Sequence, residues 1–318
     1  MKIFVTGASG VVGRRVVPLL VQGGHAVTAV GRSQHKRTAL ERTGARVVDV
    51  NLFDASALRD AVQGQDVVVN LATHMPATTL RMVLPGAWRE NDRIRREGSQ
   101  NLVDAALAGG VGRFVQESFA PVYPDRGTDW ITEDVPLEPV RYNRTVLDAE
   151  RSAERFAASG RVGVVLRFAA FYGPDSRFLR ELVGLVERGF APMPGPESAL
   201  VSSVSHDDAA TAVVAALGVP SGTYNVTDDE PVTHREYFDA LATTLGVAAP
   251  KLPPSWLAPL FGSPGRMLAR SLRMSNRKLR AASDWTPKYP SVREGFRAVV
   301  AAMPRGAPDF RAQAGFRH

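Results

Sequence analysis

The chain has 318 residues, a formal net charge of +7 and no cysteine. The absence of cysteine excludes disulfides, thiolate catalysis and cysteine-bound metals, and the six histidines never show the H-x-x-x-H spacing of a metal site, so we expect no metal. The arginines are spread without a basic tract, which indicates no nucleic-acid partner but suits a phosphorylated cofactor. Because no apolar stretch approaches the roughly 20 residues of a membrane span or forms a signal-peptide core, we expect no membrane association and a cytoplasmic protein.

From residue 2 to about 165, apolar β-branched runs alternate with helical stretches. The runs are KIFVTG, HAVTAVGR, ARVVDVNL, DVVVNLAT, GRFVQES and RVGVVLRF. Continuous apolar runs are typical of strands buried on both faces. The segments between them, such as residues 11–22 and 97–108, carry helical spacing and end near glycines. This alternation predicts an α/β fold with a doubly wound parallel sheet in residues 1–170.

After Phe171 the regular alternation of strand-like and helix-like segments is lost. FAPMPGPES and KLPPSWLAPLFGSPG are rich in proline and glycine, whereas SHDDAATAVVAALG reads as a capped helix and GTYNVTD as a strand. We expect residues 171–199 and 223–318 to form a smaller C-terminal substrate lobe. A segment near 200–222 is expected to return to the main sheet.

Two pairs of residues in this second part can be interpreted either as structural or as functional. Asp207 and Asp208 could be paired carboxylates, but they directly precede a helical run, which favours N-capping by at least one of them. Trp256 and Trp285 either pack the smaller lobe or line a substrate pocket.

TGASGVVG follows the first predicted strand and opens the first helix. Its glycines give a G-x-x-G-x-x-G loop in which small residues let the backbone turn tightly, approach a pyrophosphate and pack helix on strand. The helix N-terminus then offers N–H groups and partial positive charge to the phosphates. The sequence therefore predicts a Rossmann-type dinucleotide site in which the cofactor contacts Gly7, Ser9, Gly10, Val11, Val12 and Gly13.

The end of the second predicted strand indicates which dinucleotide binds. An acidic residue there would bind a ribose 2′-hydroxyl, but AVGRS offers Arg32 and Ser33. A guanidinium beside a hydroxyl suits a phosphate monoester, so we predict NADP(H) over NAD(H). The alternative is that Arg32 is merely an exposed loop arginine.

Several motifs in order resemble the extended and atypical short-chain dehydrogenase/reductases, the group of NAD(P)-dependent sugar epimerases and dehydratases. DVNLFD is similar to the family's adenine-contacting third strand, NLAT to its N-x-A-A segment, and FVQESFAPVY to the strand that carries an active-site hydroxyl. VVLRFAAFYGP and VSSVSHDDAATAV resemble two later family segments. The resemblance implies that the cofactor is also contacted by Asn51, Leu52, Leu71, Ala72 and Thr73.

The first catalytic position departs from the family pattern. A serine or threonine usually lies four residues before the tyrosine of V-Y-G, and here Phe119 fills that place. Ser118 precedes it, and neighbouring residues of a strand point to opposite faces. Ser118 is therefore a candidate catalytic hydroxyl only if the strand bulges or has already become loop; otherwise it is a turn hydroxyl.

The second departure lies in RYNRTVLDAE, where Tyr142 matches the tyrosine of the family's Y-x-x-x-K and Val146 stands at the lysine position. A free tyrosine has a pKa near 10, so moving it about three units towards neutral pH takes about 4 kcal/mol that a neighbouring cation normally supplies. Without that cation, Tyr142 as a phenol can still donate a proton, which helps carbonyl reduction more than alcohol oxidation. The alternative is a tyrosine packed beside the cofactor with no proton transfer.

Weaker substrate candidates are His74, which follows the NLAT segment, and Tyr172, which follows the sixth main strand. The resemblance implies an NAD(P)-dependent oxidoreductase or epimerase-like enzyme that reduces or isomerises a small carbonyl or hydroxyl substrate, as a possible homodimer. Two alternatives stay open: an NAD(P)-binding regulator without turnover, similar to NmrA-like proteins, and a non-redox cyclase or dehydratase on the same fold.

Overall fold

The computed structural model describes residues 1–76, 81, 84–193 and 195–303. Its centre is a seven-stranded sheet in which all paired neighbours run parallel. In spatial order the strands are β11 (Gly222–Val226), β7 (Val162–Phe168), β5 (Arg113–Phe119), β4 (Val67–Asn70), β1 (Lys2–Thr6), β2 (Ala26–Val30) and β3 (Arg46–Val48). The chain order reverses between β1 and β4, and such a switch point opens a binding crevice at the carboxyl ends of the strands.

Two helical layers bury the faces of this sheet. One apolar cluster joins it to α1 (Gly13–Gln22), α2 (Gln34–Glu41) and α9 (His206–Ala215), and a second joins it to α3 (Ala55–Val62), α6 (Ser99–Ala108) and α7 (Val146–Ala158). The six predicted strands are confirmed. Their β-branched runs contain few polar side chains and can therefore be buried from both sides. The doubly wound α/β prediction is confirmed as well.

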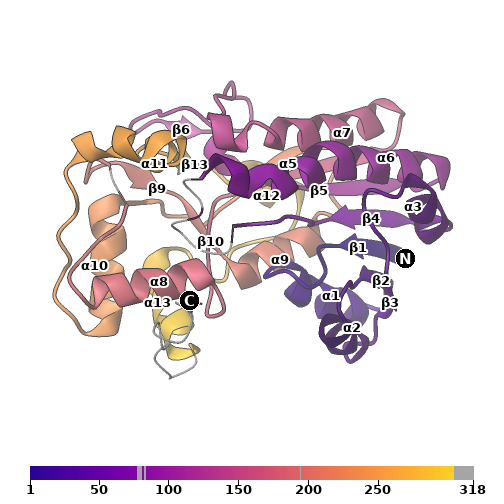
Figure 1. Cartoon of the computed structure of the whole chain (residues 1–318), viewed down its shortest axis with the longest axis horizontal. Coiled ribbons are helices and arrows are strands. Elements are labelled where there is room, and N and C mark those ends of the chain that lie inside the picture. The colour runs from indigo at the N-terminus through magenta and orange to yellow at the C-terminus, as the bar shows by residue number, and fades with distance from the viewer. Residues whose placement is uncertain (77–80, 82–83, 194, 304–318) are drawn as a thin grey trace, which may run out of the picture.

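A smaller lobe lies beside the sheet, at the left of Figure 1. Its core packs α8 (Arg177–Val186), α10 (His234–Leu245) and α13 (Val292–Ala301) together. Short strand pairs join it: β8 (Ala170–Tyr172) with β10 (Ser203–Ser205), β9 (Leu200–Val201) with β12 (Val232–Thr233), and β6 (Trp130–Ile131) with β13 (Arg273–Met274). The remaining pieces of this part are η5 (Ser255–Phe261), α11 (Gly262–Leu268) and α12 (Arg277–Ala282).

The returning segment is longer than the sequence indicated. β11 pairs with β7 from Gly222 to Val226, so residues 223–226 belong to the main sheet and not to the smaller lobe. Trp285 is buried against α9, where its indole donates to the Asp208 carbonyl. The segment around Trp285 therefore packs against the helices of the main sheet before the chain enters α13 of the smaller lobe.

Beyond the carboxyl ends of β4 and β5, the chain forms several short helical segments. They are η1 (Pro85–Trp88), α5 (Arg89–Arg93), the π turn η2 (Ile94–Gly98), η3 (Ala120–Val122) and η4 (Arg141–Asn143). In the described ranges, no helix is both long and apolar enough to cross a bilayer.

Candidate functional site

The glycine loop between β1 and α1 is held tightly against the end of β4. Gly7 has φ +66°, and a Cβ there would lie 2.2 Å from the Leu71 carbonyl oxygen, while one on Gly13 would lie 2.3 Å from the Gly7 oxygen. The backbone N–H groups of Val11 and Val12 donate to no described residue, and α1 has no side-chain cap. Free N–H groups at a helix N-terminus suit a pyrophosphate, so the loop fits a dinucleotide.

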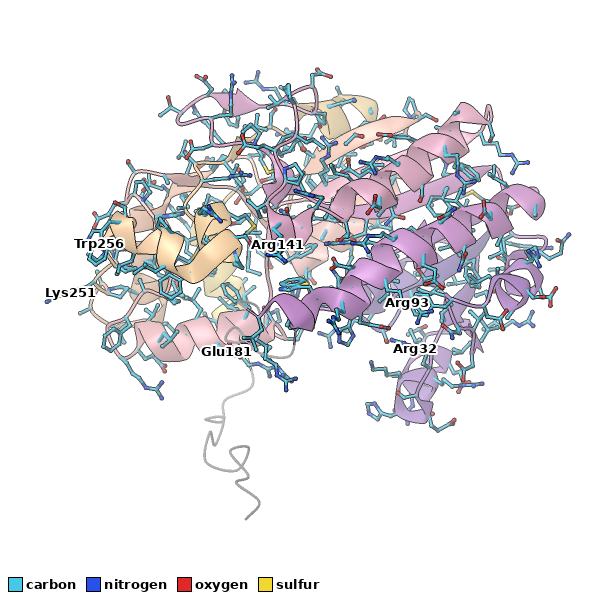
Figure 2. All side chains as sticks on the ribbon, turned by 45° about the horizontal axis from the view of Figure 1, so that its top comes forward. Arg32, Arg93, Arg141, Glu181, Lys251 and Trp256 are labelled. Atoms are coloured by element: carbon cyan, nitrogen blue, oxygen red, sulfur yellow. The ribbon has the colours of Figure 1, made fainter. Side chains whose placement is uncertain are left out.

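Arg32 and Ser33 follow β2 and are exposed, and Figure 2 shows where Arg32 lies. Arg37 in the first turn of α2 joins them, since a Cβ on Gly31 would lie 3.2 Å from Arg37 Cγ. Sequence reasoning missed Arg37, although a basic residue in the first turn after Ser33 was a usable signal. Guanidinium and hydroxyl groups at this end of β2 suit a phosphate.

The next predicted contacts lie beyond β3. Asn51 is exposed, and its Oδ1 accepts from the Phe53 N–H at 3.1 Å, which fixes the turn. Leu52 packs against Gly98 of η2, and the Arg93 guanidinium lies 3.6 Å from the centre of the Phe53 ring. An apolar and cation-capped surface of this kind suits an adenine ring.

Asn70 at the end of β4 joins three strands and a helix. Its Oδ1 accepts from Thr6 Oγ1 at 2.6 Å, and its Nδ2 donates to Gln116 at 2.9 Å and to Ser99 at 3.2 Å. All four side chains are buried. This network fixes where β4 ends and so positions the buried Leu71 and Ala72 and the exposed Thr73 at the crevice.

Ser118 does not reach the crevice. β5 keeps its register with β7 through Phe119, so the strand neither bulges nor ends early. The Ser118 hydroxyl donates to Glu150 at 2.5 Å, and Glu150 accepts two bonds from Arg167 at 2.9 and 2.7 Å. Arg167 also donates to the Tyr123 hydroxyl at 2.7 Å. Ser118 therefore belongs to a buried network under α7, on the face opposite to Phe119.

Tyr142 lies in η4, one turn before α7. Its ring centre is 4.8 Å from that of Trp88, and its hydroxyl donates to Met267 Sδ at 2.6 Å. Burial raises the pKa of Tyr142 above its ordinary value, and the charges of Arg95 and Arg270 offset this only in part. At the lysine position, Val146 is fully buried in the packing of α7. The phenol is thus held protonated at neutral pH.

A buried ion pair that the sequence analysis missed lies at the carboxyl end of β5. Arg95 of η2 and Glu117 of β5 approach to 3.9 Å, and their side chains are 5% and 11% exposed. Burial raises the pKa of Glu117, while Arg95 acts in the opposite direction. A charged residue within the apolar run RFVQESF was the available signal. π turns often mark functional sites, and this one places a cation near Tyr142 from a neighbouring element.

The two weaker substrate candidates, His74 and Tyr172, lie in different parts of the structure. His74 is exposed on the loop after β4, and its backbone N–H donates to Asn91 Oδ1 at 2.9 Å. Tyr172 is 1% exposed in the core of the smaller lobe, against Phe296, so the crevice position expected for it is wrong: β8 turns into the lobe. Trp256 is 69% exposed on the outer surface (Figure 2).

The two aspartates, Asp207 and Asp208, lie in the first turn of α9 and have structural partners. The N-cap is Ser205, whose hydroxyl accepts from the Asp208 N–H. The Asp208 carboxylate accepts from the Lys288 N–H at 2.6 Å, and Asp207 pairs with Arg15. They lie in the first helical turn, where negative charge is favourable, so N-capping by the aspartates themselves is wrong by one position. Among the described residues, no group of three or more acidic or histidine side chains is placed to hold a metal ion.

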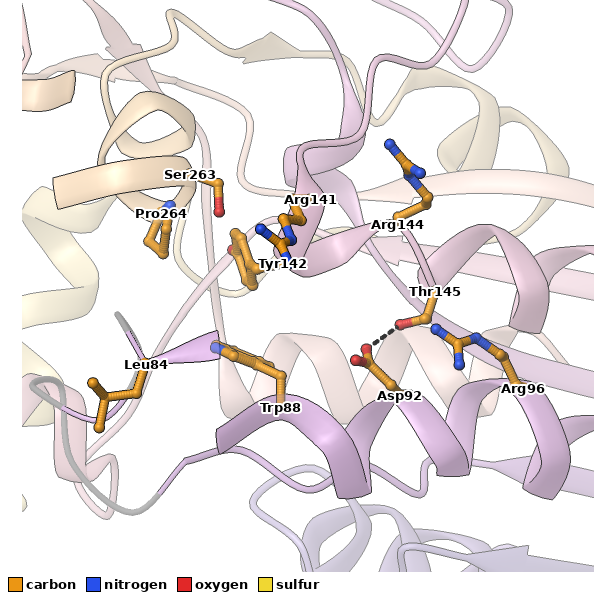
Figure 3. Close-up of a pocket in the computed structure, with 10 residues that line it drawn as sticks. All are labelled: Leu84, Trp88, Asp92, Arg96, Arg141, Tyr142, Arg144, Thr145, Ser263 and Pro264. Carbon is orange, nitrogen blue, oxygen red and sulfur yellow. Dashed lines mark hydrogen bonds between the residues drawn. The ribbon is translucent and has the colours of Figure 1, made fainter. Parts of the chain in front are cut away.

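A cleft of about 310 Å³ opens beside Tyr142, between α5, η4 and α11 (Figure 3). Its lining combines two aromatic rings with several charged side chains: Leu84, Trp88, Asp92, Arg96, Arg141, Tyr142, Arg144, Thr145, Ser263 and Pro264. The volume lies within the range of small-molecule sites. The described residues thus include a glycine loop of the dinucleotide-binding type after β1 and, beside Tyr142, a cleft of small-molecule size.

Comparison with known proteins agrees with this geometry. The model of the NAD dependent epimerase/dehydratase family matches residues 3–227. A 3-diazoavenalumate denitrifying reductase of a Streptomyces species is 33% identical over 306 residues, covering 93% of this chain and 99% of that protein. A 2-alkyl-3-oxoalkanoate reductase of Shewanella oneidensis is 27% identical, covering 72% of this chain and 62% of its own length.

Solved structures show the same fold. A UDP-glucose 4-epimerase of Thermus thermophilus in complex with NAD is 25% identical with a TM-score of 0.76, covering 95% of this chain and 98% of its own. The human epimerase family protein SDR39U1 with NADPH is 20% identical with a TM-score of 0.80, covering 95% and 100%. The family-model match over most of the sheet domain and the extent of these similarities show that the chain belongs to the NAD-dependent epimerase/dehydratase family, as an oxidoreductase or epimerase-like enzyme that uses a nicotinamide coenzyme.

Proposed function

We propose that the chain is an NADPH-dependent reductase whose substrate accepts a hydride without a proton relay from the protein. The observation that carries this proposal is the state of Tyr142. Its hydroxyl donates to Met267 Sδ, burial raises its pKa, and the place of the family's lysine holds the buried Val146. These features make Tyr142 a weak acid and leave no cation at the lysine position to form its phenolate at neutral pH.

The same observation argues against epimerisation. An epimerase must first oxidise a hydroxyl group, which needs a base, and even an unperturbed tyrosine is a phenolate in only about one molecule in a thousand at pH 7. Burial of Tyr142 makes that fraction smaller. Reduction does not need the phenolate, so the site supports transfer of hydride to the substrate rather than from it.

The coenzyme supplies the hydride when bound, and the protein holds it in place. The glycine loop suits the pyrophosphate, and Arg32, Ser33 and Arg37 suit a ribose 2′-phosphate, which supports NADPH over NADH. Arg32→Ala should weaken NADPH binding about tenfold or more and leave NADH binding unchanged, because a charge-assisted hydrogen bond is worth about 1.5–3 kcal/mol. Arg59→Ala, at an exposed arginine on α3, is the matched control. Equal NADH and NADPH affinity in the parent protein would contradict the preference.

The substrate class follows from the missing relay. The 33% identical relative is named for reducing a diazo compound with loss of nitrogen. When a hydride reaches an arenediazonium ion and N₂ departs, one C–N bond breaks, one C–H bond forms, and the coenzyme is oxidised. No alkoxide develops, so no proton donor is required. We propose this reaction for the present chain.

The Glu117 carboxylate supports a cationic substrate. It lies near the carboxyl end of β5, is 11% exposed, and accepts no hydrogen bond from the described residues. Arg95 approaches it only to 3.9 Å, longer than a direct hydrogen bond. Burial raises the pKa of Glu117, and a cation bound beside it would favour the ionised form. A partly desolvated carboxylate attracts a diazonium cation more strongly than it would in water.

The test is to mix the protein with NADPH deuterated at the transferred position and a hydroxybenzenediazonium salt. The expected result is loss of NADPH absorbance with release of N₂ and deuterium in the phenol formed. The Gly7→Ala variant, with a blocked dinucleotide loop, corrects for the uncatalysed reaction. Absence of protein-dependent N₂ release would overturn the proposed reaction.

Carbonyl reduction with Tyr142 as proton donor is the second candidate. Its support is that Tyr142 lines the cleft and that a 2-alkyl-3-oxoalkanoate reductase is among the relatives. A β-keto acid that oxidises NADPH, when the diazonium salt does not, would favour it. Tight NADPH binding with neither substrate would favour the regulator. A homodimer stays a proposal that light scattering would test.

A further inference from the structure

We infer that the cleft between α5, η4 and α11 recognises an aromatic substrate carrying a carboxylate, with Arg141 as its main anion-binding residue. This inference deepens the proposed function and rests on it only for the role of the ligand as substrate. It is carried by the rings, charges and dimensions of the cleft.

Two aromatic rings pack against each other at one end of the cleft. Trp88 belongs to η1 and Tyr142 to η4, and their ring centres are 4.8 Å apart at an interplanar angle of 54°. Figure 3 shows both rings at the opening, with Leu84 beside Trp88. The Tyr142 ring is fixed by its hydrogen bond to Met267 Sδ. Rigid rings in this position suit a flat apolar group.

The charge of the lining is strongly positive. It contains three arginines and one carboxylate, Asp92, which accepts from the Thr145 hydroxyl at 2.7 Å. Arg96 lies 3.4 Å from Asp148 and is partly neutralised. Arg141 has no ion-pair partner among the described residues, and its guanidinium lies beside the Tyr142 ring, whereas Arg144 points away from the opening (Figure 3).

Unpaired Arg141 is therefore the cation best placed for a ligand anion. A guanidinium binds a planar carboxylate through two parallel hydrogen bonds, and stacking of a ring near Trp88 and Tyr142 would direct the carboxylate towards it. The volume of about 310 Å³ is at the lower end of small-molecule sites, which fits a single-ring acid better than a nucleotide sugar.

The experiment measures binding without turnover. 4-Hydroxycinnamate and its uncharged amide are titrated calorimetrically into protein saturated with NADP⁺, with UDP-glucose as a third ligand. The expected result is that the carboxylate binds about tenfold or more tightly than the amide, and that this advantage disappears in Arg141→Ala and returns in part in Arg141→Lys. Arg59→Ala should behave as the parent.

Equal binding of acid and amide would overturn the inference, and so would an unchanged acid affinity in Arg141→Ala. Tighter binding of UDP-glucose, lost in the same variant, would also overturn it and identify a nucleotide-sugar site. Arg141 is exposed, so its replacement should not disturb folding, and a melting curve checks this. Because no turnover is measured, aromatic acids can bind even if diazonium reduction fails, and diazonium reduction can proceed even if they do not.

Discussion

Replacing Ser118 by alanine should lower stability and spare the chemistry. The Ser118 hydroxyl donates to the Glu150 carboxylate at 2.5 Å, and both side chains are buried. A hydrogen bond to a charged group contributes about 1.5–3 kcal/mol. Glu150 keeps two bonds from Arg167, so Ser118→Ala leaves no unpaired charge. The loss should therefore stay below the about 3–5 kcal/mol expected when Glu150→Gln breaks the buried pair.

Urea denaturation gives the stability change, and single-turnover oxidation of NADPH gives the rate. Ser118→Ala should shift the urea midpoint while the rate stays within about threefold of the parent, because general acid–base groups contribute about 100-fold or more. Ser198→Ala, at an exposed serine, is the matched control and should change stability by less than about 0.5 kcal/mol. A rate loss of about 100-fold with an unchanged midpoint would show that Ser118 reaches the substrate and would refute the strand geometry described above.

Three further predictions follow from other parts of the chain. Gly7→Ala should abolish NADPH binding in calorimetry because its Cβ would overlap the Leu71 oxygen, whereas Gly64→Ala, with a similar positive φ and open space, should bind normally. Burial lowers the pKa of His234 from 6.5 to about 4. The folded state thus favours the neutral ring, and its contribution of about 3 kcal/mol should be complete above pH 6.5 and disappear as the pH falls towards 4. Urea unfolding of His234→Leu should be less pH-dependent in that window, and an unchanged slope would contradict the assignment. Val146→Lys should lower the melting temperature without raising the rate, because Val146 is fully buried and an ammonium there would be desolvated.

The main sheet could be predicted because its signals are local. β-branched runs bounded by glycine identify strands buried on both faces. The position of TGASGVVG between a strand and a helix identifies the glycine loop between β1 and α1. Arg32 and Ser33 follow from the same reasoning, since the end of β2 always lies near the ribose in this topology.

The active-site details could not be predicted because they depend on packing between distant elements. Whether Ser118 faces the crevice depends on the register of β5 with β7, which a sequence of alternating residues does not reveal at a strand end. Tyr172 follows an apolar run, as a residue at the end of a main-sheet strand would, but β8 turns into the smaller lobe and buries it there. The Arg95–Glu117 pair joins residues from a π turn and a strand, and neither position carries a motif.

The central claim is that hydride transfer in this site does not use Tyr142 as a proton donor. The most direct test is the single-turnover rate of diazonium reduction by NADPH in Tyr142→Phe, measured from pH 6 to pH 9. The account predicts a rate within about threefold of the parent and the same pH dependence, since loss of general acid catalysis would cost about 100-fold or more. A loss of that size, or a pH profile that changes with the substitution, would contradict it.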